Sequence, residues 1–327
     1  MEELSLMKEQ PSYQSESYWQ NYQDYFPEHL RINHQNQPKE EWWLWQGINV
    51  HLDRYVPSTK DDVKVIMLHG GGGYARLLSP LALDLYEKGY EVVMPDFPGY
   101  GLTDSPERKV DYLTWADLVV DLIEHESEQG QQKIVLYGLS LGGMLAYYAA
   151  ARSKYVKGII ATTLCDPRLA SVRAAFAKFP RMSAAILPLL KCLNPILGTL
   201  KLPLKWFSKM HALSNNAEFN QLVVNDPNGG GNRTPLHFML SIMIATPKVE
   251  PENFNSCSVL LAHPAEDKWT PFELSEQFYQ RLACNKKVVL LENAGHMPIE
   301  QQGLDQVSRE ASKFLEEVKG CRPNTKL

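Results

Sequence analysis

Hydrophobic and polar residues alternate along this chain with two different periods. Short β-branched apolar runs, which are typical of buried parallel strands, occur at residues 63–70, 90–97, 133–140, 156–163, 257–264 and 286–296. Helical patterns, several of them closed by glycine, occur at residues 77–89, 114–130, 141–153, 271–283 and 304–320. This order predicts an α/β fold with a mostly parallel central sheet flanked by helices. A hairpin or pair of strands is expected first, over residues 40–57.

One long interval interrupts the alternation. Residues 164–253 separate two strands that a single helix would normally join. They are rich in Leu, Met, Phe and Pro, so we predict a mostly helical cap inserted between two strands and broken into short pieces by Pro188, Pro195 and Pro203. The α/β core then comprises residues 41–163 and 254–320. Residues 1–40 form an aromatic-rich extension that suits packing on the sheet edge, packing on the cap or gating of the site.

Charge and composition argue against several classes of function. The formal net charge is −5 and Lys and Arg form no dense block, so nucleic acid is not an expected partner. The 5 cysteines are far apart without a C-x-x-C pair, which disfavours a disulfide framework or a zinc site and suggests small apolar filler. The N-terminus is acidic and polar, and no uninterrupted apolar run of membrane-spanning length follows. We therefore expect no secretory signal, no transmembrane segment and a cytoplasmic location.

Four consecutive glycines, Gly70 to Gly73, follow a predicted strand and precede a predicted helix. Such a loop suits a negative group, either a phosphate or the oxyanion of a reacting substrate. A phosphate loop needs a lysine and a hydroxyl after the glycines, whereas Tyr74, Ala75 and Arg76 follow here. The alanine also breaks the G-x-G-x-x-G dinucleotide pattern. An oxyanion is therefore the favoured partner of this loop.

A nucleophile for such a reaction is found at Ser140. Residues 138–142 follow the G-x-S-x-G pattern, and they lie between a predicted strand and a predicted helix. Glycines two residues before and two residues after the serine avoid clashes in the sharp turn that exposes its hydroxyl. Ser140 is therefore the predicted nucleophile.

A serine hydroxyl needs a base to accept its proton and a carboxylate to orient that base. His296 lies just beyond the last predicted strand, and Asp267 lies on the loop after the strand at residues 257–264. We predict His296 as the base and Asp267 as the acid. Glu266, its neighbour, and Asp166, which also follows a strand, are the alternative acids.

The motifs taken together resemble those of the α/β-hydrolase superfamily. They are LHGGGG, DFPGYGLTD, GLSLGG, HPAEDKWTP and NAGHMPIE, and the resemblance runs from about residue 41 to residue 318. More narrowly, the chain is similar to the capped branch with monoglyceride lipases, lysophospholipases, esterases and proline iminopeptidase-like serine peptidases. The resemblance implies that the N–H groups of Gly71 and Leu141 form an oxyanion hole and that no metal or cofactor takes part. His69 is then a structural histidine of the glycine loop.

We therefore expect a serine hydrolase that cleaves carboxylic esters through an acyl-enzyme and takes a small acyl substrate as its partner. Apolar residues of the predicted cap should line a pocket for an apolar acyl chain. A proline iminopeptidase-like activity is the first alternative, and it would need a carboxylate for the substrate's ammonium group. Between residues 169 and 247 the only acids are Glu218 and Asp226, which favours esters. A hydrolase of carbon–carbon bonds and a non-catalytic ligand-binding protein are further alternatives.

Overall fold

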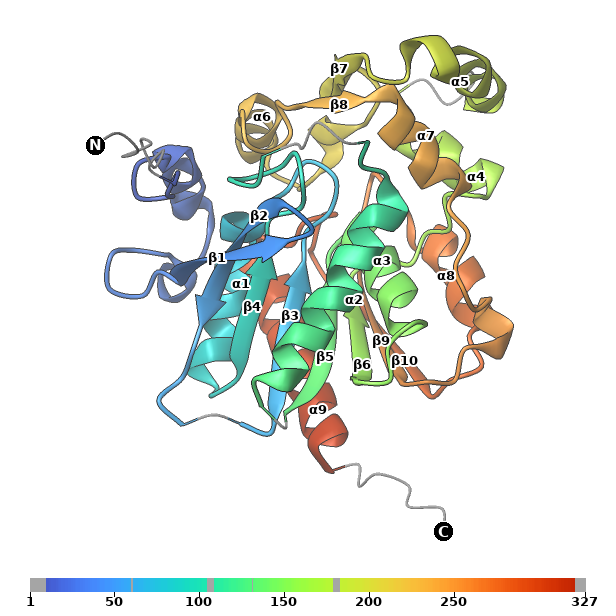
Figure 1. Cartoon of the computed structure of the whole chain (residues 1–327). Helices are drawn as coiled ribbons and strands as arrows, with labels where there is room; N and C mark the ends of the chain where they lie inside the picture. Colours follow the sequence, from blue (N-terminus) through green and yellow to red (C-terminus); the bar gives the residue numbers. More distant parts are fainter. Residues whose placement is uncertain (1–9, 60, 105–108, 131, 179–182, 321–327) are drawn as a thin grey trace, which may run out of the picture.

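An eight-stranded sheet forms the centre of the molecule (Figure 1). The computed structural model describes residues 10–59, 61–104, 109–130, 132–178 and 183–320. The strands lie in the order β1-β2-β4-β3-β5-β6-β9-β10, and all neighbours pair in parallel except β1 with β2 and β2 with β4. Their bounds are β1 Lys39–Trp45, β2 Ile48–Tyr55, β3 Val63–Leu68, β4 Glu91–Pro95, β5 Lys133–Gly138, β6 Val156–Ala161, β9 Ser258–Pro264 and β10 Lys286–Leu291.

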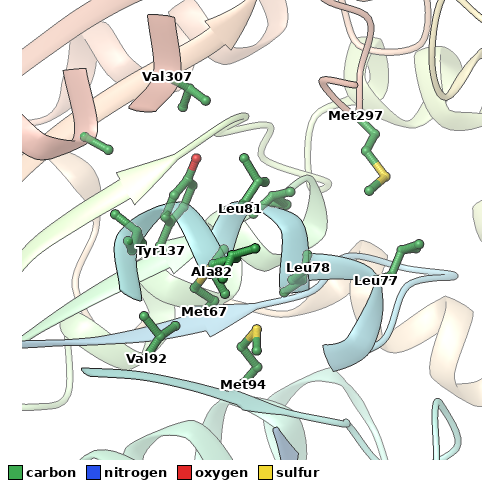
Figure 2. Packing of buried hydrophobic residues seen from close by; sticks show 14 of the residues in the cluster. Met67, Leu77, Leu78, Leu81, Ala82, Val92, Met94, Tyr137, Met297 and Val307 are labelled. Carbon is green, nitrogen blue, oxygen red and sulfur yellow. The ribbon is translucent and has the colours of Figure 1, made fainter. Parts of the chain in front are cut away.

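Helices cover both faces of the sheet and confirm the predicted α/β architecture. One face packs against α1 (Ala75–Glu87) and α9 (Gln301–Gly320), and the other against α2 (Tyr112–Glu128), α3 (Leu141–Ala150) and α8 (Phe272–Arg281). Figure 2 shows side chains of α1 and α9 meeting those of the strands in one of these layers. Because both faces are covered, β3 is buried at every position, which explains why all of its residues except Lys64 are apolar.

The segment between β6 and β9 contains helices and a small ribbon. Its α-helices and strands are α4 Ala170–Phe176, α5 Ser183–Leu197, β7 Lys201–Pro203, α6 Ala217–Asn225, β8 Arg233–Pro235 and α7 Leu236–Ile244. The short 3-10 helices of the segment are η4 Leu204–Trp206, η5 Met210–Ala212 and η6 Pro251–Asn253. The antiparallel β7–β8 ribbon was not expected from the sequence, because each strand has only three residues.

Two of the three prolines that were expected to break this segment do not break it. Pro188 and Pro195 lie inside α5, which continues through both. A proline removes one helical hydrogen bond, but both residues are exposed, so water can hydrate the carbonyl that loses its partner. The helix therefore tolerates the two interruptions on its solvent side.

The described part of the N-terminal extension packs on two different elements. It forms the short 3-10 helices η1 (Ser17–Tyr25) and η2 (Glu28–Leu30), and β1 already begins at Lys39. Its buried aromatic residues, among them Trp19 and Tyr22, join the core cluster that includes α1 and α9. The same helix η1 contacts α6 of the β6–β9 segment, and Figure 1 shows the two side by side.

Cys165, Cys192, Cys257 and Cys284 are free thiols. Cys192 is exposed on α5, so it does not fill an apolar space as expected, while Cys321 lies outside the described residues. Over the described residues, no helix combines the length and the apolar character that crossing a membrane requires.

Candidate active site

Ser140 occupies a strained turn between β5 and α3. Its backbone has φ 54° and ψ −124°, a conformation that residues other than glycine rarely adopt. A Cβ atom at Gly138 would lie 2.1 Å from the Gly142 carbonyl oxygen, and one at Gly142 would lie 2.2 Å from the Leu68 oxygen. Both positions therefore require glycine. The turn holds the serine side chain at the N-terminus of α3, where the sequence motif had placed it.

The structure brings Ser140, His296 and Asp267 into one hydrogen-bonded chain. His296 Nε2 lies 2.6 Å from Ser140 Oγ, and His296 Nδ1 lies 2.7 Å from Asp267 Oδ2. These distances place a base beside the hydroxyl and a carboxylate beside the base. The imidazole is 2% exposed, so its two hydrogen bonds act in a site that largely excludes water.

Asp267 is oriented by donors from its own loop. The N–H groups of Trp269 and Thr270 donate to Asp267 Oδ1 at 2.8 and 2.7 Å, and the Thr270 hydroxyl donates to Oδ2 at 2.8 Å. Burial raises the pKa of Asp267, but attraction to His296 and the hydrogen bonds of His296 and Thr270 lower it by more. The pKa therefore lies below its ordinary value, and the carboxylate stays ionised beside the imidazole.

The two alternative acids are engaged elsewhere. Asp166 accepts from Arg168, whose Nη2 lies 2.7 Å from its Oδ2. Glu266 accepts from the side-chain amide of Asn215 at 2.9 Å. Of the three candidates, Asp267 is the acid that the structure places against His296.

The glycine loop lies against the turn that carries Ser140. A Cβ atom at Gly70 would be 2.8 Å from Ser140 Cβ and 3.4 Å from Leu141 N, and one at Gly71 would be 3.9 Å from Leu141 Cδ2. Leu141 is the first residue of α3, so its N–H has no acceptor within the helix. The glycine loop and the N-terminus of α3 therefore both lie beside Ser140.

His69 contacts backbone groups with both ring nitrogens. Its Nδ1 lies 2.8 Å from the Gly70 carbonyl oxygen, and its Nε2 accepts from the Phe97 N–H at 3.1 Å. Burial lowers the pKa of His69 to about 4. The imidazole is therefore neutral and ties the glycine loop to the end of β4, which agrees with a structural role.

Two cavities meet at Ser140, and Gly71 and Trp269 line both. The small cavity has a volume of about 40 Å³ and lies beside His296. Its apolar walls come from Leu77, Leu78, Met210, Leu213, Val223 and Met297. The large cavity has a volume of about 270 Å³ and is lined mainly by the β6–β9 segment. Its apolar residues include Leu189, Leu190, Leu204, Trp206, Phe207 and Met239.

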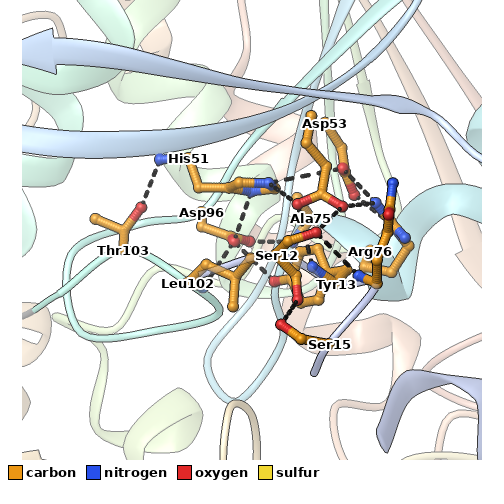
Figure 3. Close-up of polar contacts among 12 residues, drawn as sticks. Ser12, Tyr13, Ser15, His51, Asp53, Ala75, Arg76, Asp96, Leu102 and Thr103 are labelled. Carbon is orange, nitrogen blue, oxygen red and sulfur yellow. Dashed lines mark hydrogen bonds and ion pairs between the residues drawn. The ribbon is translucent and has the colours of Figure 1, made fainter. Parts of the chain in front are cut away.

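A buried polar network lies beneath the glycine loop, and the sequence analysis did not predict it (Figure 3). Asp96, at the end of β4, accepts from the Ala75 N–H at 2.6 Å and from the Tyr13 hydroxyl at 2.7 Å. His51 Nδ1 lies 3.0 Å from the same carboxylate, and Arg76 donates to Asp53 at 2.7 Å. The only signal in the sequence was charged residues within otherwise apolar strands. The network joins the N-terminal extension to the start of α1.

The imidazole of His51 is expected to stay protonated far above neutral pH. Burial lowers its pKa, but hydrogen bonds to Asp96 and Glu40 and the negative charge around it raise the pKa to about 10. In the unfolded chain the pKa is about 6.5, so between these values only the folded state keeps the proton. The stabilisation is complete below about pH 6.5 and is lost as the pH rises towards 10, by up to about 1.4 kcal/mol per pH unit.

Nitrogen NMR of the imidazole and urea unfolding between pH 6 and pH 10 would measure this effect. The stability advantage of the wild type over His51→Gln should shrink across that range. A His51 resonance that titrates near pH 6.5 would contradict the expectation, and it can be read from the wild type alone if the variant does not fold.

The fold and the site define an α/β-hydrolase. The family model for serine aminopeptidase, S33, matches residues 59–302, which is most of the chain, and the chain belongs to this family. Proline iminopeptidase of Saccharolobus solfataricus is 36% identical over 121 residues, 36% of this chain and 38% of that protein. The first curated relatives are matched over only 42% and 38% of their lengths.

Solved structures show the same fold. The monoacylglycerol lipase of Paleococcus ferrophilus has a TM-score of 0.67 at 22% identity, over 82% of this chain and 99% of that one. A soluble variant of monoglyceride lipase from Saccharomyces cerevisiae has a TM-score of 0.72 at 15% identity, over 90% of this chain and 98% of that one.

Within the described ranges, no three His, Cys, Asp or Glu side chains lie together as metal ligands would.

Proposed function

We propose that this protein is a serine hydrolase that cleaves carboxylic esters with an apolar acyl chain. The observation that carries the proposal is the chain of contacts from Ser140 Oγ through His296 to Asp267, which ends in a mainly apolar cavity. The lipase structures of the same fold support an ester substrate. The β6–β9 segment acts in this proposal as the cap that encloses the acyl chain.

The reaction proceeds through an acyl-enzyme. His296 accepts the proton of Ser140 as its Oγ attacks the acyl carbonyl carbon, and the N–H groups of Gly71 and Leu141 stabilise the oxyanion that forms. The imidazolium, held by Asp267, then gives its proton to the leaving alcohol. Water enters, His296 takes its proton, and the same steps release the acid and restore the serine.

Charge around the site favours an ester over an aminopeptidase substrate. The Asp226 carboxylate is buried and accepts from Tyr22 and Tyr74, while Glu218 accepts from Tyr25 at the surface. Among the described residues that line the large cavity none is acidic, whereas Arg173 and Lys178 are cationic. A substrate ammonium group would therefore meet repulsion in this cavity, so the similarity to a proline iminopeptidase does not extend to this feature of the substrate.

Longer acyl chains are expected to be better substrates until the large cavity is full. Each methylene buried there adds up to about 0.8 kcal/mol, which is nearly fourfold in kcat/KM per carbon. The measurement is kcat/KM for ethyl esters from acetate to dodecanoate, followed by acid release, beside a series of aminoacyl amides. Medium or long chains should exceed acetate, and esters should exceed amides.

Replacing Leu190 with Trp provides a test of the cavity itself. Leu190 is 9% exposed and lines the large cavity, so a bulkier side chain there should move the optimum to a shorter acyl chain. An optimum at acetate in the wild type, or amide turnover above ester turnover, would refute the apolar-ester proposal and leave the serine chemistry standing.

A further inference from the structure

Asp226 joins three segments that are far apart in the sequence. The hydroxyl groups of Tyr22, in the N-terminal extension, and Tyr74, at the start of α1, both donate to Asp226 Oδ2 at 2.7 Å. The carboxylate directly follows α6 and is fully buried. Burial raises the pKa of Asp226 above its ordinary value, and the hydrogen bonds from Tyr22 and Tyr74 offset only part of this rise. This contact fixes the end of α6 against the glycine loop.

The N-terminal extension also holds α6 along its length. The Tyr18 hydroxyl donates to the Leu222 carbonyl at 2.9 Å. Phe219, which is fully buried, packs against the rings of Tyr22, Tyr25 and Phe26 at centroid distances of 5.5, 5.6 and 6.2 Å. Aromatic contacts of this kind add to the free energy of burial. The extension therefore packs against α6 through Phe219 and the Leu222 carbonyl.

The helix α6 also lines the small cavity through Val223, one turn after Phe219 on the same face. A Cβ atom at Gly230 would lie 2.5 Å from the Val223 carbonyl oxygen and 2.8 Å from Met210 Cε. A Cβ atom at Gly72 would likewise lie 2.8 Å from Met210 Cε. The glycines at residues 229–231 therefore allow the loop after α6 to pack closely against the glycine loop of residues 70–73. A small movement of α6 would change the size of the small cavity.

The proton transfer decides which part of the substrate enters this cavity. His296 must deliver its proton to the leaving oxygen, so the leaving group lies on the His296 side of Ser140. The small cavity is lined by His296 and Met297. Among the described residues, the large cavity is lined by Leu141 and not by His296. The leaving alcohol therefore belongs in the cavity of about 40 Å³, and the acyl chain in the one of about 270 Å³.

We infer that Tyr22 is a specificity-determining residue that, by holding α6 through Asp226, limits the substrate to esters of small alcohols. The inference rests on the proposed ester hydrolysis and adds the class of leaving group to it. Tyr22 does not contact the substrate and acts through the position of Val223. A cavity of about 40 Å³ holds only a few water-sized groups, since about 10 to 15 Å³ is enough for one water, so it suits a small alcohol.

The test compares Tyr22→Phe with Tyr25→Phe as its matched control. Both tyrosines lie on η1 and both rings contact Phe219, but only Tyr22 donates to Asp226, whereas Tyr25 donates to Glu218 at the exposed surface at 3.4 Å. One acid, octanoic, is used as its ethyl and its cyclohexylmethyl ester. The ratio of kcat/KM for the two esters is measured, with thermal unfolding recorded for each protein.

The wild type and Tyr25→Phe should prefer the ethyl ester to the same degree. In Tyr22→Phe that preference should fall roughly tenfold, because the freed α6 admits the larger alcohol. A purely stabilising role for Tyr22 would lower Tm without changing the ratio. If Tyr22→Phe does not fold, Val223→Ala widens the same cavity directly and should lower the ratio in the same direction.

The outcomes separate this inference from the proposed function. An unchanged ratio in folded Tyr22→Phe, or a change only in the acyl-chain optimum, would overturn the role of Tyr22 while ester hydrolysis stands. For Val223→Ala, an unchanged ratio would overturn the assignment of the leaving group to the small cavity. Absence of hydrolysis of both esters by the wild type, even at high enzyme concentration, would overturn the ester proposal and this inference together.

Discussion

Replacement of Ser140 by alanine is expected to abolish nearly all ester hydrolysis without unfolding the protein. The Oγ atom 2.6 Å from His296 Nε2 is the group that would form the acyl-enzyme, and alanine removes it alone. Because members of such a triad act as a unit, the loss of kcat should be on the order of 10⁴- to 10⁶-fold. The turn tolerates alanine no worse than serine, since both carry a Cβ atom at φ 54°. The measurement is kcat together with covalent labelling by a fluorophosphonate.

Ser127→Ala is the matched control for this variant. This control makes the same substitution in the last turn of α2, where the Ser127 hydroxyl donates to the Glu124 carbonyl at 2.8 Å. The control should keep both activity and labelling. Retention of a tenth of the activity by folded Ser140→Ala would refute the assignment of Ser140 as the nucleophile. A wild type that folds but does not react with the probe would favour a ligand-binding protein of the same fold.

Replacement of Asp267 by asparagine is expected to lower kcat by roughly 10⁴-fold through a change of the His296 tautomer. Oδ1 accepts two backbone N–H groups, from Trp269 and Thr270, so the amide oxygen of asparagine must take that position. The NH₂ group then faces His296 Nδ1 in place of Oδ2. It would donate to Nδ1 and leave the proton on Nε2, where the ring can no longer accept from Ser140.

Asp166→Asn and Glu266→Gln are the controls for this prediction. Both remove a charge from an acid that the sequence offered as an alternative, and both acids have partners other than His296. Their kcat should stay within a few-fold of the wild type, provided that circular dichroism shows a folded protein. A larger loss in Asp166→Asn than in Asp267→Asn would show that the acid has been misassigned.

Local sequence was sufficient for most of the fold. Strands buried on both faces read as mostly apolar runs, and each predicted run became a strand of the central sheet, although β10 at the sheet edge is only partly buried. The Ser140 turn was equally readable, because Gly138 and Gly142 are required by contacts within a few residues of the serine and with the neighbouring strand. The elements that were wrong or missed are those with weak local signals. The helix α5 continues through Pro188 and Pro195, which were expected to break it, and the β7–β8 ribbon has very short strands.

The sequence by itself determined the α/β architecture and singled out Ser140 and His296, which the structure places within hydrogen-bond distance, because periodicity and turn chemistry act over a few residues. It left three acids as candidates, and only the structure placed Asp267 against His296. The contacts of Tyr13 with Asp96 and of Tyr22 with Asp226 span 83 and 204 residues. No local pattern encodes such pairs, since each depends on where separate elements pack. The tertiary structure alone therefore decided how the N-terminal extension and α6 shape the space beside the serine.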